Sequence, residues 1–242
     1  RDDVESRGLG DVYKRQFLSP AQRAQAEDLL RLAGVSETAF VSQGGYETAE
    51  RRILLFLPDW LEAEDAESQS PLRFLRASFR REETAPTHRD FLGSLMGLGI
   101  VREKLGDILV GPDSADLVVL DSVAEFLLQN WTSAGRTHLS VTAVSAEELR
   151  VPETKTEEVR DTVSSLRLDT VAASALRMSR GKAAELVERG AVQVNWRPCM
   201  KPDKLLTEGD TVSARGFGKF QLAQVGGLTK KGRTAILVRR YV

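Results

Sequence analysis

Apolar residues recur at helical or strand spacing along most of the chain after its first sixteen residues. Ser19-Pro20 pairs a capping residue with a proline, which predicts the start of a helix. The run from Arg52 to Leu57 predicts a buried strand, and residues 17–70 as a whole a small N-terminal α/β segment. One helical face would carry the apolar positions spaced i, i+3, i+4 and i+7, which are Ala26, Leu29, Leu30 and Ala33.

Residues 71–146 alternate between strand and helix patterns. The predicted order is strand, helix, strand, strand, helix, strand, which is the βαββαβ order of the ferredoxin-like fold that RNA-recognition domains also use. No segment has the aromatic-rich pattern with which such domains stack bases, so this fold alone does not predict RNA binding. The six segments are Leu72–Phe79, His88–Leu98, Asp107–Val110, Leu117–Leu120, Ser122–Trp131 and Leu139–Val144.

A charged stretch broken by proline, residues 147–163, predicts a linker to a last module at residues 164–242. This module would have two short helices, Leu166–Met178 and Arg180–Arg189, with Ser179 as the cap between them. Its predicted strands are Ala191–Asn195, Thr211–Ala214 and Thr234–Val238.

The charge of the chain is strongly divided, although its formal net charge is only −1. Residues 1–163 carry 19 Lys and Arg against 29 Asp and Glu, whereas residues 164–242 carry 15 against 6. A basic module attached to an acidic body is typical of nucleic-acid binding. The alternative is that the excess positive charge of the module is spread evenly over a solvated surface and binds no partner.

The start of the second helix in the basic module has the features of a phosphate site. A helix N-terminus offers N–H groups without helical partners and a partial positive charge. Ser179, Arg180 and Lys182 lie at this end, and Arg177 lies one turn earlier. Trp196 either stacks on a base or covers the sheet. Further cations that can join the same face are Arg197, Lys201 and Lys204.

Other classes of function are disfavoured by what the sequence contains. Its apolar runs are far shorter than the roughly 18 residues of a membrane span. One cysteine and two histidines make a disulfide framework or an ordinary zinc site improbable, and no GxxxxGK[ST] loop is present. We therefore expect no cofactor, no metal, no small-molecule substrate, no membrane contact and no enzymatic activity. Residues 1–16 show neither helical nor strand period, and we interpret them as a non-native or artefactual leader.

The C-terminal module resembles an S4 RNA-binding domain (αL-type). The resemblance covers about 50 residues, with Trp196 where many S4 domains have glycine. It rests on Arg167-Leu168-Asp169, Ser179-Arg180, Ala183, Gly190 to Asn195 and Glu208 to Val212. The predicted fold class is thus α+β, with an N-terminal α/β segment, a ferredoxin-like middle domain and an S4 domain.

From Phe17 onward the chain also resembles the YlmH-like S4 proteins of bacteria, in which Trp196 is no departure. The resemblance rests on Gly44 to Glu47, Arg51 to Pro58, Gly99 to Ile108 and Val194 to Trp196. It implies a cytoplasmic protein that binds rRNA and tRNA on stalled large ribosomal subunits carrying peptidyl-tRNA. The candidate RNA-binding residues are then Arg167, Arg177, Ser179, Arg180, Lys182, Trp196, Arg197, Lys201 and Lys204.

Two alternatives stay open. Pseudouridine synthases that bear an S4 domain carry their catalytic aspartate in a similar Arg-Leu-Asp run, so Asp169 would be catalytic in an RNA-modifying enzyme. In this chain the run opens the S4 helix itself, which favours a structural role for Asp169 in the first helical turn. The second alternative is a cell-division adaptor whose basic face binds acidic protein or lipid.

Overall fold

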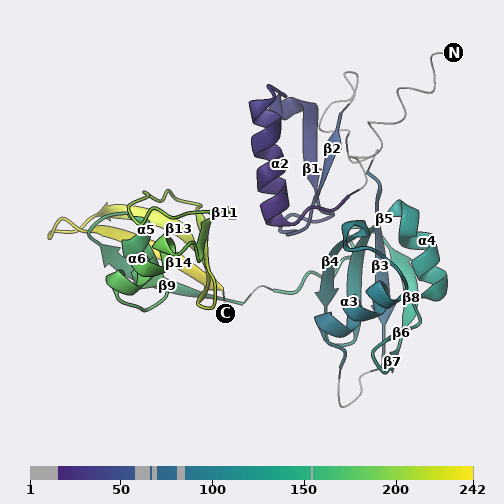
Figure 1. Ribbon diagram of the computed structural model, residues 1–242. Coiled ribbons are helices and arrows are strands. Elements are labelled where there is room, and N and C mark those ends of the chain that lie inside the picture. Colours follow the sequence, from purple (N-terminus) through teal and green to yellow (C-terminus); the bar gives the residue numbers. More distant parts are fainter. Residues whose placement is uncertain (1–15, 58–65, 67–69, 81–84, 154, 242) are drawn as a thin grey trace. The chain divides into compact units, whose positions relative to one another are not determined.

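The structure, a computed structural model, describes residues 16–57, 66, 70–80, 85–153 and 155–241 (Figure 1). Nearly all of the proposed leader and most of the acidic stretch before residue 70 lie outside the described residues. The chain divides into two compact units, residues 1–152 and residues 153–242. The division into 17–70 and 71–146 stays a prediction.

The N-terminal segment combines one helix with a two-stranded hairpin. Helix α2 (Pro20–Leu32) begins with a capping box, because the Ser19 hydroxyl accepts from the Gln22 N–H and the Gln22 side chain accepts from the Ser19 N–H. A 3₁₀ turn, η1 (Glu37–Ala39), precedes strands β1 (Phe40–Gln43) and β2 (Ile53–Phe56), which pair antiparallel. The helix and the strand β2 confirm the predicted elements. The strand β1 was not predicted.

The predicted apolar face of α2 is only partly buried. Leu29 is 66% exposed and Leu32 is 83% exposed, while the buried residue of the helix is Ala24. The predicted spacing therefore does not mark a buried face at Leu29, because helical spacing identifies a stripe of residues but not the surface that covers it.

The middle domain has the predicted ferredoxin-like topology. Its sheet has the order β4-β5-β3-β8 with antiparallel neighbours, and helices α3 and α4 connect the strands. A small hairpin, β6 with β7, lies between α4 and β8. The elements are β3 (Leu72–Ser78), α3 (His88–Gly97), η3 (Arg102–Lys104), β4 (Leu105–Val110), β5 (Ser114–Leu120), α4 (Asp121–Asn130), β6 (Ser133–Ala134), β7 (Thr137–His138) and β8 (Ser140–Val144).

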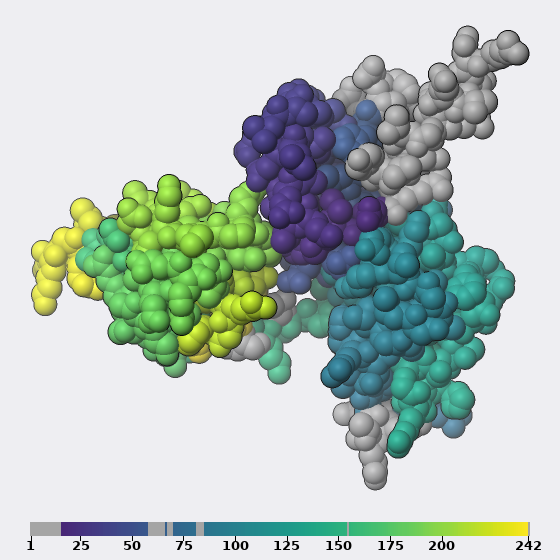
Figure 2. Space-filling model, viewed as in Figure 1, coloured from purple at the N-terminus to yellow at the C-terminus, as the bar shows by residue number. Residues whose placement is uncertain are grey.

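Both faces of the middle of this sheet are buried. On one face Leu75 and Leu117 pack with the helical residues Phe91 and Leu127. On the other face the N-terminal segment covers Leu72, Val118 and Leu120 with the side chains of Phe17 and Ile53. Figure 2 shows the purple N-terminal residues directly against the blue and teal surface of the middle domain. Every residue of β5 is consequently buried.

Two glycines permit this close covering. A Cβ on Gly106 would lie 2.9 Å from the ring of Phe17, and one on Gly45 would lie 2.5 Å from the ring of Phe74. Gly45 also has φ +86°, a conformation that other residues rarely adopt. The backbone at Gly45 therefore lies against the Phe74 ring of the sheet, and the β4 backbone at Gly106 lies against the Phe17 ring, where a Cβ would clash.

Asp107 joins the two parts of the first unit by hydrogen bonds. Its carboxylate accepts from the Tyr46 hydroxyl at 2.8 Å and from the backbone N–H groups of Glu50 and Arg51 at 2.7 and 3.2 Å. The Arg51 side chain in turn donates to the carbonyls of Phe17, Arg102 and Leu105. Burial, with the charge and hydrogen bond of Asp107, raises the pKa of Tyr46 well above its ordinary value. Asp107 and the segment around it thus have a structural role.

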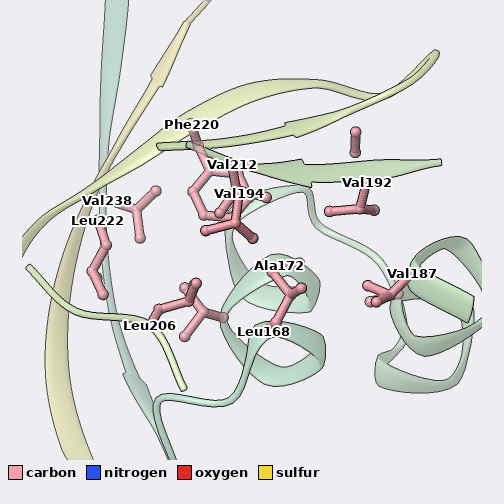
Figure 3. Packing of buried hydrophobic residues seen from close by; sticks show 14 of the residues in the cluster. Leu168, Ala172, Val187, Val192, Val194, Leu206, Val212, Phe220, Leu222 and Val238 are labelled. Carbon is pink, nitrogen blue, oxygen red and sulfur yellow. The ribbon is translucent and has the colours of Figure 1, made fainter. Parts of the chain in front are cut away.

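The second unit is a six-stranded sheet with two helices on one face. The strand order is β11-β10-β12-β13-β14-β9, and α5 and α6 cover one side (Figure 1). The core between the layers includes Leu168, Val187, Val212 and Phe220 (Figure 3). The elements are β9 (Thr156–Val163), α5 (Leu168–Ala175), α6 (Arg180–Glu188), β10 (Val192–Val194), β11 (Arg197–Pro198), β12 (Thr211–Ala214), β13 (Gly218–Leu228) and β14 (Thr234–Tyr241).

The predicted linker over 147–163 is wrong for most of its length. Thr156–Val163 form β9, which pairs along its whole length with β14. At the other end, the Arg150 N–H donates to Asp116 at 2.7 Å and the Glu148 carbonyl accepts from Arg76, so this stretch belongs to the first unit. The charged composition suggested a linker, but β9 is an edge strand with one solvated side, where charged residues are common.

Candidate nucleic-acid interface

The predicted helix start is present at α6. The Ser179 hydroxyl accepts from the Lys182 N–H at 3.2 Å, and this cap begins the helix at Arg180. A Cβ built on Gly181 would meet no atom within 4 Å, so the space beside the first turn is open. The Lys182 ammonium lies 4.9 Å from the centre of the Phe217 ring, in the turn between β12 and β13. This end of α6 thus combines a helix N-terminus with a cation and open space.

A buried carboxylate holds two arginines beside this end. Asp169, which is 3% exposed, accepts from Arg167 at 3.2 and 3.1 Å and from Arg180 at 3.0 Å. Burial acts against its ionisation, but the hydrogen bonds from Arg167, Arg180 and Thr170 hold the pKa of Asp169 below its ordinary value. Because two guanidinium groups share one carboxylate, the cluster keeps a net positive charge. Asp169 therefore fixes the position of these arginines without neutralising both.

Arg177 does not join this cluster. Its guanidinium pairs at 2.6 Å with Glu157 of β9, and Arg240 of β14 pairs with the same carboxylate. Arg177 also has φ +52°, in the turn between α5 and α6. Since β9 lay in the predicted linker, sequence reasoning did not show a carboxylate close to this arginine.

The loop after β11 reaches the start of α5. The Lys204 carbonyl accepts from the Leu168 N–H at 2.8 Å, and the Pro202 carbonyl accepts from the Asp169 N–H at 3.0 Å. These bonds bring the backbone of the Lys201–Lys204 loop beside Arg167, so the exposed Lys201 and Lys204 belong to the same side of the unit.

Trp196 lies in the β10–β11 turn and Arg197 directly follows it, at the edge of the sheet that β11 forms. Asn195 and Trp196 have φ of +49° and +60°, and Val194 pairs with Arg197 across them. The Asn195 side chain secures the turn by donating to Asp210 at 2.7 Å and accepting from the Thr211 N–H at 2.9 Å. Apart from Arg177, which pairs with Glu157, the predicted residues therefore form two groups, one around Asp169 and α6 and the other around Trp196.

Sequence reasoning missed the residues that lie near Trp196 on β13 and β14. The Lys219 ammonium lies 5.6 Å from the centre of the Trp196 ring and 4.7 Å from that of Tyr241. The alternation of Lys219, Phe220, Gln221 and Leu222 is the signal that could have identified the strand.

A basic helix–sheet module of this kind defines the chain as an S4-domain protein. The family model described as "S4 domain" matches residues 166–212, and the model described as "Putative RNA-binding domain in YlmH" matches residues 72–148. The chain is also 35% identical, over 224 residues, to "Ribosome-associated protein quality control protein P2" of Bacillus subtilis. That match covers 93% of this chain and 85% of the relative. The chain therefore belongs to the YlmH-like family of S4 RNA-binding proteins, as the sequence resemblance indicated.

A solved structure, "Cell division protein ylmH from Streptococcus pneumoniae", is similar over 59% of this chain and 86% of its own, with 23% identity and a TM-score of 0.46. In the described part of the chain, no cluster of three or more His, Cys, Asp or Glu is placed to hold a metal ion. Among the same residues, no helix is long and apolar enough to cross a membrane.

Proposed function

We propose that this protein binds structured rRNA and tRNA through its S4 domain, on stalled large ribosomal subunits that carry peptidyl-tRNA, and that it acts in the cytoplasm without catalysing a reaction. The observation that carries the proposal is the pair of arginines, Arg167 and Arg180, fixed by Asp169 beside the capped start of α6. Guanidinium groups held in place bind phosphate with little further loss of side-chain entropy. The name of the Bacillus relative supports the ribosomal part of the proposal.

The geometry of Asp169 favours binding over catalysis. A catalytic aspartate needs access to the substrate, whereas this carboxylate is 3% exposed and accepts hydrogen bonds from two arginines and from Thr170. An RNA-modifying enzyme would have to break this cluster before its aspartate could reach a base.

The test measures binding of the full chain to isolated large subunits and to an rRNA stem-loop over a range of salt concentrations. Four to six phosphate contacts predict a log–log salt slope of about −3 to −5. Arg180→Ala combined with Lys182→Ala should weaken binding by about 2–4 kcal/mol and reduce the slope by about 2. Because Arg180 also supports Asp169, Lys182→Ala alone serves as the variant that leaves this cluster intact.

The matched control removes the same number of charges from the first unit, by Arg89→Ala combined with Arg136→Ala. Both arginines are exposed. An equal loss of affinity in the control would show that total charge, rather than the site at α6, governs binding. Binding without salt dependence would contradict the proposal.

A further inference from the structure

The second unit has a sheet face that neither of its helices covers. Phe220, Leu222, Ile236 and Val238 point into the core beneath α5 and α6. Side chains alternate between the two faces of a strand, so their neighbours Lys219, Gln221, Leu237 and Arg239 lie on the opposite face. The hydrogen bonds of β9 agree, because Asp161 and Glu157 accept from Ser174 and Arg177 on the helical side, which leaves Glu158 and Arg160 on the opposite side. We call this opposite side the outer face.

Two aromatic rings flank a cation on the outer face, and a second cation, Arg239, lies beside them between Gln221 and Glu158. Tyr241 is the register partner of Lys219, and Arg239 is the register partner of Gln221. The Lys219 ammonium lies between the rings of Trp196 and Tyr241, at 5.6 and 4.7 Å from their centres.

The conformation of Trp196 is unusual for its residue type. A two-residue hairpin turn with positive φ at both central positions favours Asn-Gly, and here a tryptophan takes the second position with φ +60°. A bulky residue in this conformation is strained, and strain of this kind is concentrated at functional sites. The strain is explained if the indole is required at this edge of the outer face.

The same face continues into a shallow hollow between β9, β13 and β14. It has a volume of about 610 Å³, and its lining includes Arg160, Thr162, Gln224, Gly226 and Leu237. Leu237 is two residues from Arg239 on the same side of β14, so the hollow adjoins the aromatic and basic part. Gly226 lies where the β13–β14 register shifts, so the hydrogen-bond ladder is locally irregular beside the hollow.

Resting on the proposed RNA binding, we infer that the outer face is a second RNA site, which takes unpaired nucleotides. Their bases stack on Trp196 and Tyr241, and their phosphates bind Lys219 and Arg239. A cation–π contact is weak compared with a charge-assisted bond to phosphate, so a base can replace Lys219 on the rings while its ammonium binds a phosphate. The model of the S4 family ends at residue 212, before Lys219, Arg239 and Tyr241.

The experiment uses the full chain with two probes, a ten-nucleotide oligouridylate and an RNA stem-loop without unpaired ends. Trp196→Ala should weaken oligouridylate binding about tenfold, and Trp196→Phe should restore most of it. Lys219→Gln combined with Arg239→Gln should reduce the log–log salt slope for the oligouridylate by about 1.4, since two contacts to a single strand are removed. Thermal unfolding of each variant verifies the fold.

The matched control is Lys182→Ala on the helical side, which should weaken stem-loop binding and leave oligouridylate binding unchanged. If the Trp196 and Lys182 variants weaken both probes alike, the chain has one RNA site and the inference is wrong. Equal affinity for a ribose-phosphate oligomer of the same length without bases, or for polyglutamate, would show that binding depends on charge alone and not on base stacking. This result would also overturn the inference.

The two proposals fail in different ways. If the chain binds the stem-loop but not the oligouridylate, the outer face is no RNA site and the proposed function is unaffected. If the chain binds neither probe, the proposed function fails as well. Ultraviolet crosslinking of the bound oligouridylate should modify Trp196 or Tyr241, and crosslinks confined to α6 would contradict the inference.

Discussion

The two units each contain an antiparallel sheet with helices on one face, and they differ in what happens to the other face. In the first unit, Phe17 and Ile53 cover it with apolar side chains, and β5 is buried throughout. In the second unit, the corresponding face carries Lys219, Arg239 and the rings of Trp196 and Tyr241. An RNA-recognition fold binds bases on its open sheet face. The middle domain has the topology of an RNA-recognition fold, but this sheet face is covered by the N-terminal segment. In the S4 unit the corresponding sheet face is not covered by the helices of the unit.

The largest expected effect comes from removing the cover of the first sheet. Phe17 is 1% exposed and packs on Val118 and Leu120. Phe17→Ala should lower the free energy of unfolding of the first unit by about 3–5 kcal/mol, because it leaves a cavity at the centre of this layer. Hydrogen exchange measured by mass spectrometry should show loss of protection in β5 while β12 to β14 keep theirs.

Phe126→Ala is the matched control for Phe17→Ala, because Phe126 lies in the same unit and is 43% exposed. It should cost about 1 kcal/mol or less. If Phe17→Ala changes protection no more than this control, the sheet face is not closed in the way the structure shows. The uncovered face of the Phe17 variant should bind a hydrophobic dye rather than RNA, since its residues are apolar.

The elements that were predicted correctly are those with strong local signals. Ser19-Pro20 and Ser179 are capping residues at true helix starts, and the alternation over 71–146 gave the right topology. What was missed depends on contacts distant in sequence. The pairing of β9 with β14, which brings Glu157 to Arg177, joins residues about 80 positions apart and has no local signature. The outer face could not be predicted without β13, and Gly226 and Gly227 interrupt the alternating pattern of this strand.

The second effect concerns the cluster that supports the helical side of the S4 unit. Asp169→Asn should lower the free energy of unfolding of this unit by about 2 kcal/mol at neutral pH, because charged hydrogen bonds to Arg167 and Arg180 are lost. The folded pKa of Asp169 lies below its unfolded value of about 3.9. The stabilisation is therefore complete above about pH 4 and is lost as the pH falls through the folded pKa.

Urea unfolding near pH 7 and near pH 3 checks this dependence. The difference between the parent and Asp169→Asn should be large at the higher pH and smaller at the lower one. Glu188→Gln, at an exposed position of α6, is the control and should change stability by less than about 0.5 kcal/mol. A constant difference between the parent and Asp169→Asn over this range would show that the ionised carboxylate does not provide the stabilisation.

A third, smaller effect is expected at the hydrogen bond between Tyr46 of the N-terminal segment and Asp107 of the first sheet. Tyr46→Phe removes the bond to Asp107 and should lower the free energy of unfolding by about 1–1.5 kcal/mol. Burial and the neighbouring Asp107 raise the folded pKa of Tyr46 above its unfolded value of about 10. The contribution of the neutral phenol is thus complete below about pH 10 and is lost as the pH rises through the folded pKa.

Denaturant unfolding near pH 8 and above pH 10 should show the difference between the parent and Tyr46→Phe becoming smaller at the higher pH. The control is Tyr241→Phe, on the open face of the other sheet, which should leave the first unit unchanged at both pH values. If the difference for Tyr46 grows with pH, the hydroxyl ionises more readily in the folded state, and the assigned hydrogen bond would be wrong.

The smallest effect tests which residues of the N-terminal segment hold it on the sheet. Leu32 of α2 is 83% exposed, whereas Ile53 of β2 is fully buried against the sheet. Leu32→Gln should therefore change the free energy of unfolding by less than about 0.5 kcal/mol, while Ile53→Ala should cost about 2–5 kcal/mol. Both are measured by urea unfolding of the full chain. A loss above about 1 kcal/mol for Leu32→Gln would show that this leucine is covered in solution. In that case α2, together with Phe17 and Ile53, would close the face that distinguishes the first sheet from the second.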